Sequence, residues 1–260
     1  MGNIRRISKK YYLRQIVSCM LVYFMFFGIP VQVALAVENP APGALPSYTG
    51  ADYAVGAGSI GTIDSGLNSL TINSVANGTA IYIKNHDIGA LGTVTYNQVP
   101  NGWALVKINE TLGSTFYGDG APTGIAGNLI ASDNFILMNN QGISSAPGSL
   151  IQARNFVGAA MRITDADFGN FANGTIDYLN FYTQGGDIGS VTNNGTIEVE
   201  NIAALIGRNV TNKGVITTTA PGGAVVMAAG ESVYLSEVGS NVSVEVSQGY
   251  TRPYLSLIHI

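Results

Sequence analysis

A short motif that recurs about every 20 residues constrains the fold of this chain more than any other feature. Asparagine and glycine precede an isoleucine in residues 172–176, 193–197 and 212–216, and the successive isoleucines lie 21 and 19 positions apart. A short apolar strand follows each motif, at 179–182, 203–206 and 224–228. This period predicts a solenoid, here a β-helix. Asparagine and glycine suit its corners because they tolerate positive φ, and asparagines at equivalent corners can stack into hydrogen-bonded ladders.

The chain upstream of this repeat also shows the period of a β-strand. From about Tyr53 onward, short apolar runs alternate with glycine and asparagine, at 69–75, 79–84, 92–97, 101–108 and 134–138. Ile81 and Ile83 share one face, which is period two. About ten coils, each advancing about 4.8 Å, would give a rod about 50 Å long. A β-sandwich is the alternative because it also has short strands and turns, but the regular late repeat favours the β-helix.

The composition excludes two other fold classes. Only 11% of the residues are charged and 46% are hydrophobic, whereas about a quarter of an average soluble domain is charged. Disorder requires low hydrophobicity and high net charge, and helical bundles are rich in Glu, Lys and Arg. One window, residues 149–161, is compatible with a helix, although Gly148 and Gly158 weaken it. We therefore expect an all-β fold.

The first 36 residues have the three parts of a cleavable secretory signal. Five basic residues and no acidic residue open the chain, an apolar run follows, and small residues stand at Ala34 and Ala36. We expect signal peptidase to cleave before Val37. A retained membrane anchor is the alternative, but Pro30 and Gln32 interrupt the apolar run.

The predicted mature chain is acidic and has no cysteine. Cys19 is the single cysteine and lies in the signal, where lipid attachment is a less favoured alternative because its Ile-Val-Ser-Cys sequence precedes most of the apolar run. Disulfides and thiolate chemistry are therefore excluded, and a core built from about 220 residues must supply the stability. The mature chain has 7 Lys and Arg against 16 Asp and Glu, a formal net charge of −9. This charge disfavours nucleic acid and anionic membranes as partners.

The chain after the signal divides into three parts. Residues 37–50 contain three prolines and predict an extended lead-in. Residues 51–248 are expected to form the β-helix. Residues 249–260 break the pattern and end in an apolar run, so we expect a truncated reading frame or an artefactual tail there.

Several segments occur in an order that resembles a known family. The family patterns Ile-x-Trp-x-x-Phe-x-Ile-Gly, Val-x-Phe-x-Gln and Gly-x-Leu-x-Ala correspond to residues 81–89, 94–98 and 127–131. A strand with an Asn-Pro-x-Gly-Ile turn and a segment ending in Asp-x-Asp-Phe correspond to residues 135–143 and 148–168, and the late Asn-x-Gly-x-Ile rungs and residues 225–233 are also typical. From about Ser47 to Leu235 the chain thus resembles the N-terminal secretion domain of the filamentous haemagglutinin family, the exoproteins of bacterial two-partner secretion.

The resemblance implies a right-handed parallel β-helix with N-terminal capping strands and no enzymatic activity. Such domains cross the inner membrane through the general secretory machinery, and a dedicated outer-membrane β-barrel transporter recognises them unfolded. Folding outside the cell, coil by coil, biases the movement without ATP. The implied product is an adhesin, haemolysin or contact-dependent toxin that is secreted from, or displayed on, a Gram-negative-type bacterium, with host-cell or glycan receptors bound by downstream repeats.

Two departures from the family concern motifs associated with secretion. Asn139 and Asn140 stand where the family has Asn-Pro, and residues 106–107 replace its Asn-Arg dipeptide. The turn formed by Asn139, Asn140, Gln141 and Gly142 is nevertheless the candidate element for recognition by the transporter. An ordinary corner of a β-helix is the alternative reading of the same four residues.

A β-helical polysaccharide-active enzyme is the competing hypothesis. Asp165 and Asp167, two positions apart, would share one face of a strand, and such enzymes use clustered acids. No further acidic or basic cluster joins them, and His86 and His259 lack the spacing of metal ligands. We therefore expect no catalytic residue, metal or cofactor. A self-contained surface binding protein and an autotransporter passenger, which needs its own C-terminal barrel, are the remaining alternatives.

Overall fold

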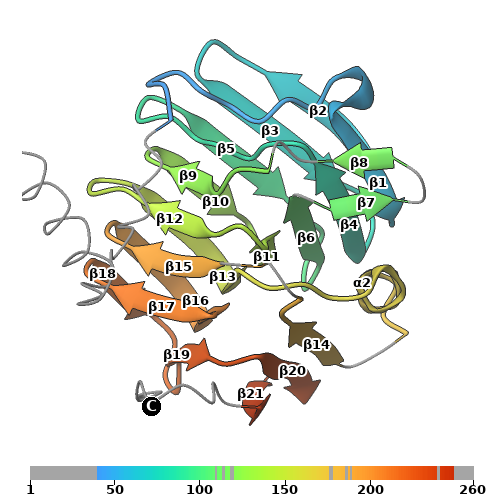
Figure 1. Cartoon of the computed structure of the whole chain (residues 1–260). Coiled ribbons are helices and arrows are strands. Elements are labelled where there is room, and N and C mark those ends of the chain that lie inside the picture. The colour runs from blue at the N-terminus through green and yellow to red at the C-terminus, as the bar shows by residue number, and fades with distance from the viewer. Residues whose placement is uncertain are drawn as a thin grey trace, which may run out of the picture. The chain divides into compact units, whose positions relative to one another are not determined.

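The chain winds into coils of parallel strands. Figure 1 shows a computed structural model that describes residues 40–108, 110–112, 115–117, 120–175, 178–184, 187, 189–238 and 241–248. The predicted signal of residues 1–36 and the tail of residues 249–260 lie outside the described residues. The lead-in is described from residue 40, and its backbone docks on the first coil, where Leu91 N–H donates to Pro42 O at 2.7 Å.

Three stacks of parallel strands form the walls of the helix. The first sheet contains β3 (Ser69–Ser74), β5 (Thr93–Asn97), β10 (Asn128–Ala131), the N-terminal halves of β13 (Leu150–Ala159) and β16 (Thr196–Gly207), and β18 (Val215–Thr218). The second sheet contains β4 (Gly78–Ile83), β6 (Trp103–Ile108), β11 (Asn134–Asn139), the C-terminal halves of β13 and β16, and β19 (Ala224–Ala229). The third sheet contains β9 (Thr123–Ile125), β12 (Ile143–Ser145), β15 (Ser190–Asn193) and β17 (Asn209–Asn212). The predicted right-handed parallel β-helix is confirmed.

One apolar position of the first sheet repeats in every coil and fills the interior. Consecutive strands place these residues in register: Leu70, Val94, Leu129, Ile151, Ile197 and Ile216. The first five are buried and the last packs against them. Period-two alternation therefore sets which side chains line the core. The strands expected at 69–75, 79–84, 92–97, 101–108 and 134–138 are confirmed as β3, β4, β5, β6 and β11.

The second sheet is buried on both faces. Every residue of β4, β6 and β11 is buried, which explains why these strands are almost continuously apolar. Their inward residues join the interior core, whereas their outward residues lie beneath α2 (Asp165–Ala172), β14 (Tyr178–Tyr182) and β20 (Ser232–Val238). Side chains that cover the outward face include Phe168, Phe171, Leu179, Phe181, Val233 and Leu235. β20 also pairs with β21 (Asn241–Gln248).

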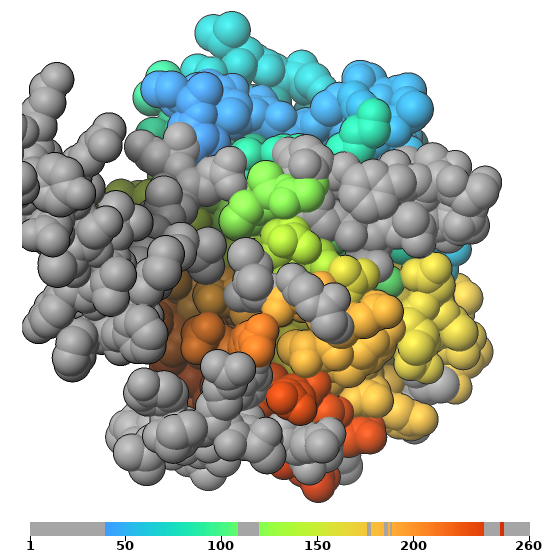
Figure 2. Space-filling model, viewed as in Figure 1, coloured from blue at the N-terminus to red at the C-terminus, as the bar shows by residue number. Residues whose placement is uncertain are grey.

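Antiparallel strands close the N-terminal end of the β-helix, as expected. After the short η1 (Gly50–Asp52), β1 (Tyr53–Ala57) pairs with β4, and β2 (Ile60–Ser65) pairs with β3. These strands cover edges of the first coil that would otherwise be open to pairing with other chains. Figure 2 shows the resulting order on the surface, from the blue cap to the red residues near the C-terminal end.

The number of coils is smaller than expected. The first sheet has six strands along the described chain, so the prediction of about ten coils is wrong. The reason is that some segments of the chain lie outside the coils of the β-helix and form other elements. A hairpin of β7 (Glu110–Leu112) and β8 (Thr115–Tyr117) follows β6, and α2 with β14 follows β13.

The helix lies elsewhere than the sequence pattern indicated. Most of residues 149–161, which were compatible with a helix, form β13, and a Cβ added at Gly158 would lie 3.2 Å from the Phe156 ring and 3.4 Å from Leu205. The helix is α2, which begins after Thr164, whose hydroxyl accepts a hydrogen bond from Asp167 N–H at 3.0 Å. An N-cap threonine and acidic residues in the first turn favour helix initiation. No helix among the described residues is long and apolar enough to cross a membrane.

Two of the three repeated motifs are equivalent corners and one is not. Ile197 and Ile216 are register partners in β16 and β18. The motif at 172–176 instead ends α2: Asn173 is the C-cap and Gly174 has φ of +67°. Glycine suits the two places for different reasons. Gly174 adopts positive φ at the helix end, whereas the corner glycines do not: a Cβ on Gly195 would lie 2.7 Å from Ala146 O and one on Gly214 would lie 2.0 Å from Gly195 O, so the expectation of positive φ at these corners is wrong. Sequence similarity alone therefore did not distinguish the two uses.

Candidate functional site

The candidate recognition turn is a tight corner between the second and third sheets. β11 ends at Asn139 and β12 begins at Ile143. Gly142 N–H donates to Asn139 O at 2.9 Å, and Gln141 N–H donates to the Asn139 side-chain oxygen at 2.9 Å. Gly142 has φ of +135°, a conformation that strongly favours glycine. The turn therefore depends on the particular residues at its first and last positions.

Asn139 ties the turn to the preceding coil. Its side chain is 1% exposed, and its Nδ2 donates to Ala121 O at 2.9 Å and to Thr123 Oγ1 at 3.0 Å. Its oxygen accepts the bond from within the turn, so both ends of the amide are used. This side chain is part of the wall of the β-helix.

The Asn140 side chain also points into the protein, but it contacts a residue that follows the turn in the sequence, whereas Asn139 contacts residues that precede it. It is 2% exposed, and its Nδ2 donates to Asp187 Oδ1 at 3.0 Å. Asp187 is itself buried and receives both Arg162 Nε and Nη2, at 2.8 and 2.9 Å. Burial would raise the pKa of Asp187, but hydrogen bonds from Arg162, Gln184 N–H and Asn140 hold it below its ordinary value. Asp187 is thus a carboxylate anchored by four donors.

The folded turn presents little of itself to a partner. Asn139, Asn140 and Gly142 are buried, and Gln141 is half-buried. A buried amide whose hydrogen bonds are internal cannot be read by another protein without opening the corner. The four predicted residues therefore form one corner, and the side chains of Asn139 and Asn140 become accessible only when that corner opens.

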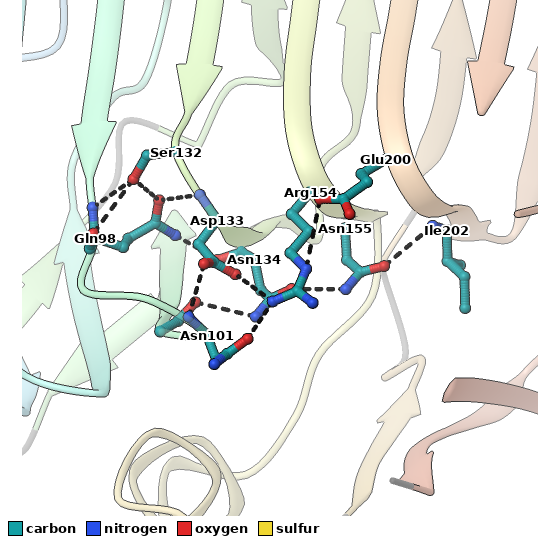
Figure 3. A network of polar contacts seen from close by, with 10 residues as sticks. Gln98, Asn101, Ser132, Asp133, Asn134, Arg154, Asn155, Glu200 and Ile202 are labelled. Atoms are coloured by element: carbon teal, nitrogen blue, oxygen red, sulfur yellow. Dashed lines mark hydrogen bonds and ion pairs between the residues drawn. The ribbon is translucent and has the colours of Figure 1, made fainter. Parts of the chain in front are cut away.

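A second polar network, which the sequence did not reveal, lies at the corner between the first and second sheets (Figure 3). Asn155 Nδ2 donates to Asn134 Oδ1 at 2.6 Å, and Ile202 N–H donates to Asn155 Oδ1 at 3.0 Å. The expected asparagine ladder is thus confirmed here, and Asn193 and Asn212 form another rung pair at 2.8 Å. Each ladder satisfies buried polar groups where the chain turns between sheets.

Arg154 binds the outer side of this network. Figure 3 shows its guanidinium between Asp133 on one side and Glu200 on the other, with 3.6 Å to each carboxylate. It also bonds to Asn101 Oδ1, and Asn101 has φ of +60°. The charges are already paired within the protein, so this network is best explained as a structural contact that joins the four successive coils of Asn101, Asp133, Arg154 and Glu200.

The two aspartates of the enzyme hypothesis do not share a strand face. Asp165 and Asp167 lie in the first turn of α2, so that expectation is wrong. Asp165 Oδ1 accepts from Lys107 Nζ at 3.0 Å and from Tyr82 Oη at 3.1 Å. Lys107 is buried beneath α2 and also donates to Ile163 O at 3.0 Å. The carboxylate therefore anchors a helix over the second sheet.

His86 is a core residue and not part of a ligand set. Its ring is fully buried, and Nε2 lies 2.7 Å from Tyr96 Oη, which in turn lies 2.6 Å from Tyr48 Oη. Burial lowers the pKa of His86 to about 4, so it is neutral near pH 7. Among the described residues, no group of three or more His, Cys, Asp or Glu could hold a metal ion. Ala34, Ala36, Val37 and His259 lie outside the described residues.

These features define a class: a right-handed parallel β-helix with an antiparallel N-terminal cap and one sheet covered by a helix and extra strands. Among solved structures, the chain is similar to the secretion domain of HMW1 from Haemophilus influenzae, with a TM-score of 0.62 and 19% sequence identity. The match covers 77% of this chain and 49% of that one, so the chain spans about half the length of that structure. The similarity establishes a shared fold. No protein-family model and no curated protein sequence matches the chain.

Proposed function

We propose that this chain is the secretion-directing N-terminal domain of a bacterial two-partner secretion exoprotein. The supporting observation is the match of its fold to a secretion domain over 77% of its length. In this proposal the general secretory machinery and signal peptidase process residues 1–36, and an outer-membrane β-barrel transporter then exports the unfolded chain. The domain has no enzymatic activity, and any adhesin-like activity toward host-cell or glycan receptors belongs to downstream repeats.

Because the candidate recognition turn is buried in the folded domain, recognition of its side chains must come before folding. Asn139 and Asn140 are 1% and 2% exposed in the folded domain, so a transporter reads their side chains before the corner closes. Folding at the cell surface then removes these side chains from reach and buries apolar area coil by coil, which favours outward movement. Recognition by the transporter and folding of the corner are therefore mutually exclusive states of these residues.

The proposal is tested by secretion from a Gram-negative host. The chain is expressed with and without the outer-membrane transporter gene found in its flanking DNA, and mature chain is measured in the medium and in the periplasm. We expect appearance in the medium only with the transporter. Equal release without the transporter, or retention with it, would overturn the proposal.

A matched pair of corners tests whether the turn itself is recognised. Asn139 and Asn140 have a counterpart in Asn193, which is buried, and Asn194, which is half-buried; this pair also forms a corner with hydrogen-bonded amides. Each pair is changed to alanine, and secretion is compared with the free energy of unfolding. We expect the first pair to reduce secretion more strongly than the second at a similar loss of stability. If secretion falls in proportion to stability in both, the turn is an ordinary corner.

A further inference from the structure

Asp187 holds the recognition turn from a position 47 residues further along the chain. Its Oδ1 accepts from Asn140 Nδ2 and from Arg162 Nη2, and its Oδ2 accepts from Arg162 Nε and from Gln184 N–H at 2.8 Å. Its backbone oxygen accepts from Arg208 Nη1 at 3.1 Å. Asp187 therefore connects the turn to Arg162 through its carboxylate and to Arg208 through its backbone carbonyl.

The backbone next to Asp187 covers the same turn. A Cβ added to Gly189 would lie 2.8 Å from Asn140 O and 2.1 Å from Ala160 O. Only glycine permits this approach, because any side chain would overlap the backbone of Ala160 and come too close to that of the turn. Gly189 O in turn accepts from Arg208 N–H at 3.0 Å. Gly189 thus packs against the turn, and its own backbone is bound by Arg208 from a later part of the chain.

The bond between Asn140 and Asp187 offsets an unfavourable feature of the closed turn, which is an unsatisfied buried oxygen. Asn140 Oδ1 is buried and accepts no hydrogen bond among the described residues. An unsatisfied buried acceptor is unfavourable relative to the hydrated, open turn. The bond from the same amide to the Asp187 carboxylate is charge-assisted and therefore strong. Loss of that bond leaves an amide that is better solvated in the open form.

We propose that Asp187 is a positioning residue that ends recognition by the transporter, because it binds Asn140 and locks the turn in its buried form. This inference rests on the proposed function, since the turn must be what the transporter reads. Arg162, Asp187 and Arg208 all follow the turn in the sequence, so the lock is absent while those residues have not yet folded. The turn is readable on an unfolded chain and hidden on a folded one.

Hydrogen exchange followed by mass spectrometry tests the lock without a transporter. In Asp187→Ala, we expect the amides of Gln141 and Gly142 to exchange about tenfold or more faster, while those of β13 and β16 keep their protection. Asn140→Ala removes the bond to Asp187 together with the unsatisfied Oδ1 and leaves the Arg162 pair, so it should speed exchange in the turn less than Asp187→Ala does. Asp133→Ala, which removes another buried carboxylate paired with an arginine, is the control and should leave the turn unchanged.

A rescue variant separates positioning from general stability. Asn140 occupies the second position of a β-turn whose first carbonyl accepts from Gly142 N–H, and proline is favoured at that position. In the double variant Asp187→Ala, Asn140→Pro, we expect slow exchange at Gly142 to return, because the ring fixes the turn without a carboxylate. An unchanged turn in Asp187→Ala, or exchange that rises equally in the turn and in β13, would overturn the lock.

Secretion measurements then distinguish failure of this inference from failure of the proposed function. With the flanking transporter gene present, Asp187→Ala should leave recognition intact and leave the turn of the exported protein open to exchange. If the wild-type chain is not exported by the transporter, the proposed function fails and the lock has no role in recognition. If the wild-type chain is exported but Asp187→Ala leaves the turn closed, only the lock is wrong.

Discussion

Lys107 Nζ lies 3.0 Å from Asp165 Oδ1, and the two side chains differ sharply in exposure, at 1% for the lysine and 50% for the aspartate. The ammonium also lies 5.5 Å from the centre of the Tyr82 ring and 5.4 Å from that of Phe168. It lies on the outward face of the second sheet among buried apolar side chains, where an unpaired charge would be unfavourable. The pair therefore fixes how α2 covers that sheet.

Removing either partner of this pair should have unequal effects. Asp165→Ala leaves a buried ammonium with Ile163 O as its remaining hydrogen-bond acceptor, and we expect a loss of about 2 kcal/mol in the free energy of unfolding. Lys107→Met keeps the volume and leaves a half-exposed carboxylate bonded to Tyr82, so we expect a change within about 1 kcal/mol. Urea titrations of both variants measure the difference. A larger loss in Lys107→Met would contradict this account.

The stability of the folded chain should fall in mild acid because of His86. Its pKa is lowered by burial from 6.5 to about 4, so the folded state binds fewer protons than the unfolded state between those values. Stability is therefore complete above pH 6.5 and is lost as the pH falls toward 4, by about 2 to 3 kcal/mol at pH 4.5. Chemical denaturation at pH 7.5 and 4.5 measures this, and His86→Phe should remove most of the difference.

Asp187 contributes in a lower pH range, which keeps the two effects separable. Its pKa is held below the ordinary value of 3.8, so its stabilising contribution is present above that value and is lost as the pH falls further. The difference between pH 7.5 and 4.5 should therefore persist in Asp187→Asn. If that difference disappears in Asp187→Asn, the assignment to His86 is wrong.

The asparagine ladder should be stabilising where it is buried. Asn155 accepts from Ile202 N–H and donates to Asn134, and it is 7% exposed. Asn155→Ala leaves a buried N–H without its acceptor, so we expect a loss of about 2 kcal/mol. Asn73 accepts a similar bond from Asn97 on the exposed side of the first sheet, and Asn73→Ala should cost less than about 1 kcal/mol because water replaces the amide. Thermal or urea unfolding of the two variants compares them, and equal losses would contradict the role of burial.

The walls of the β-helix were predictable because their signals are local. Alternation such as that of Ile81 and Ile83 gives strand faces, and an Asn-x-Gly motif before Ile197 and Ile216 gives register. The position of α2 was missed, although Thr164 followed by Asp165 and Asp167 is an N-terminal helix signal. Glycine at position 169 and the short length of the helix made that signal weak.

The partners of the candidate turn were not predictable from the sequence. The Asn139–Gly142 corner was found from the resemblance, but Asp187 is 47 residues from Asn140 and 25 residues from Arg162, and no period connects them. Lys107 and Asp165 are separated by 58 residues. The sequence offered one general signal for these contacts. Buried charged side chains are almost always paired, and with only 11% charged residues each buried charge in this chain has few candidate partners.

Replacing Gly78 and Gly169 by alanine should change the stability of the chain in opposite directions. A Cβ on Gly78 of β4 would lie 1.5 Å from Ala172 O, so Gly78→Ala must displace the end of α2 from the second sheet, and we expect a loss of more than about 2 kcal/mol. Gly169 lies inside α2, and a Cβ there meets no atom within 4 Å. Gly169→Ala should therefore stabilise the chain by up to about 1 kcal/mol through helix propensity. Urea unfolding measures both changes, and a Gly78→Ala variant as stable as the wild type would show that α2 does not rest on β4.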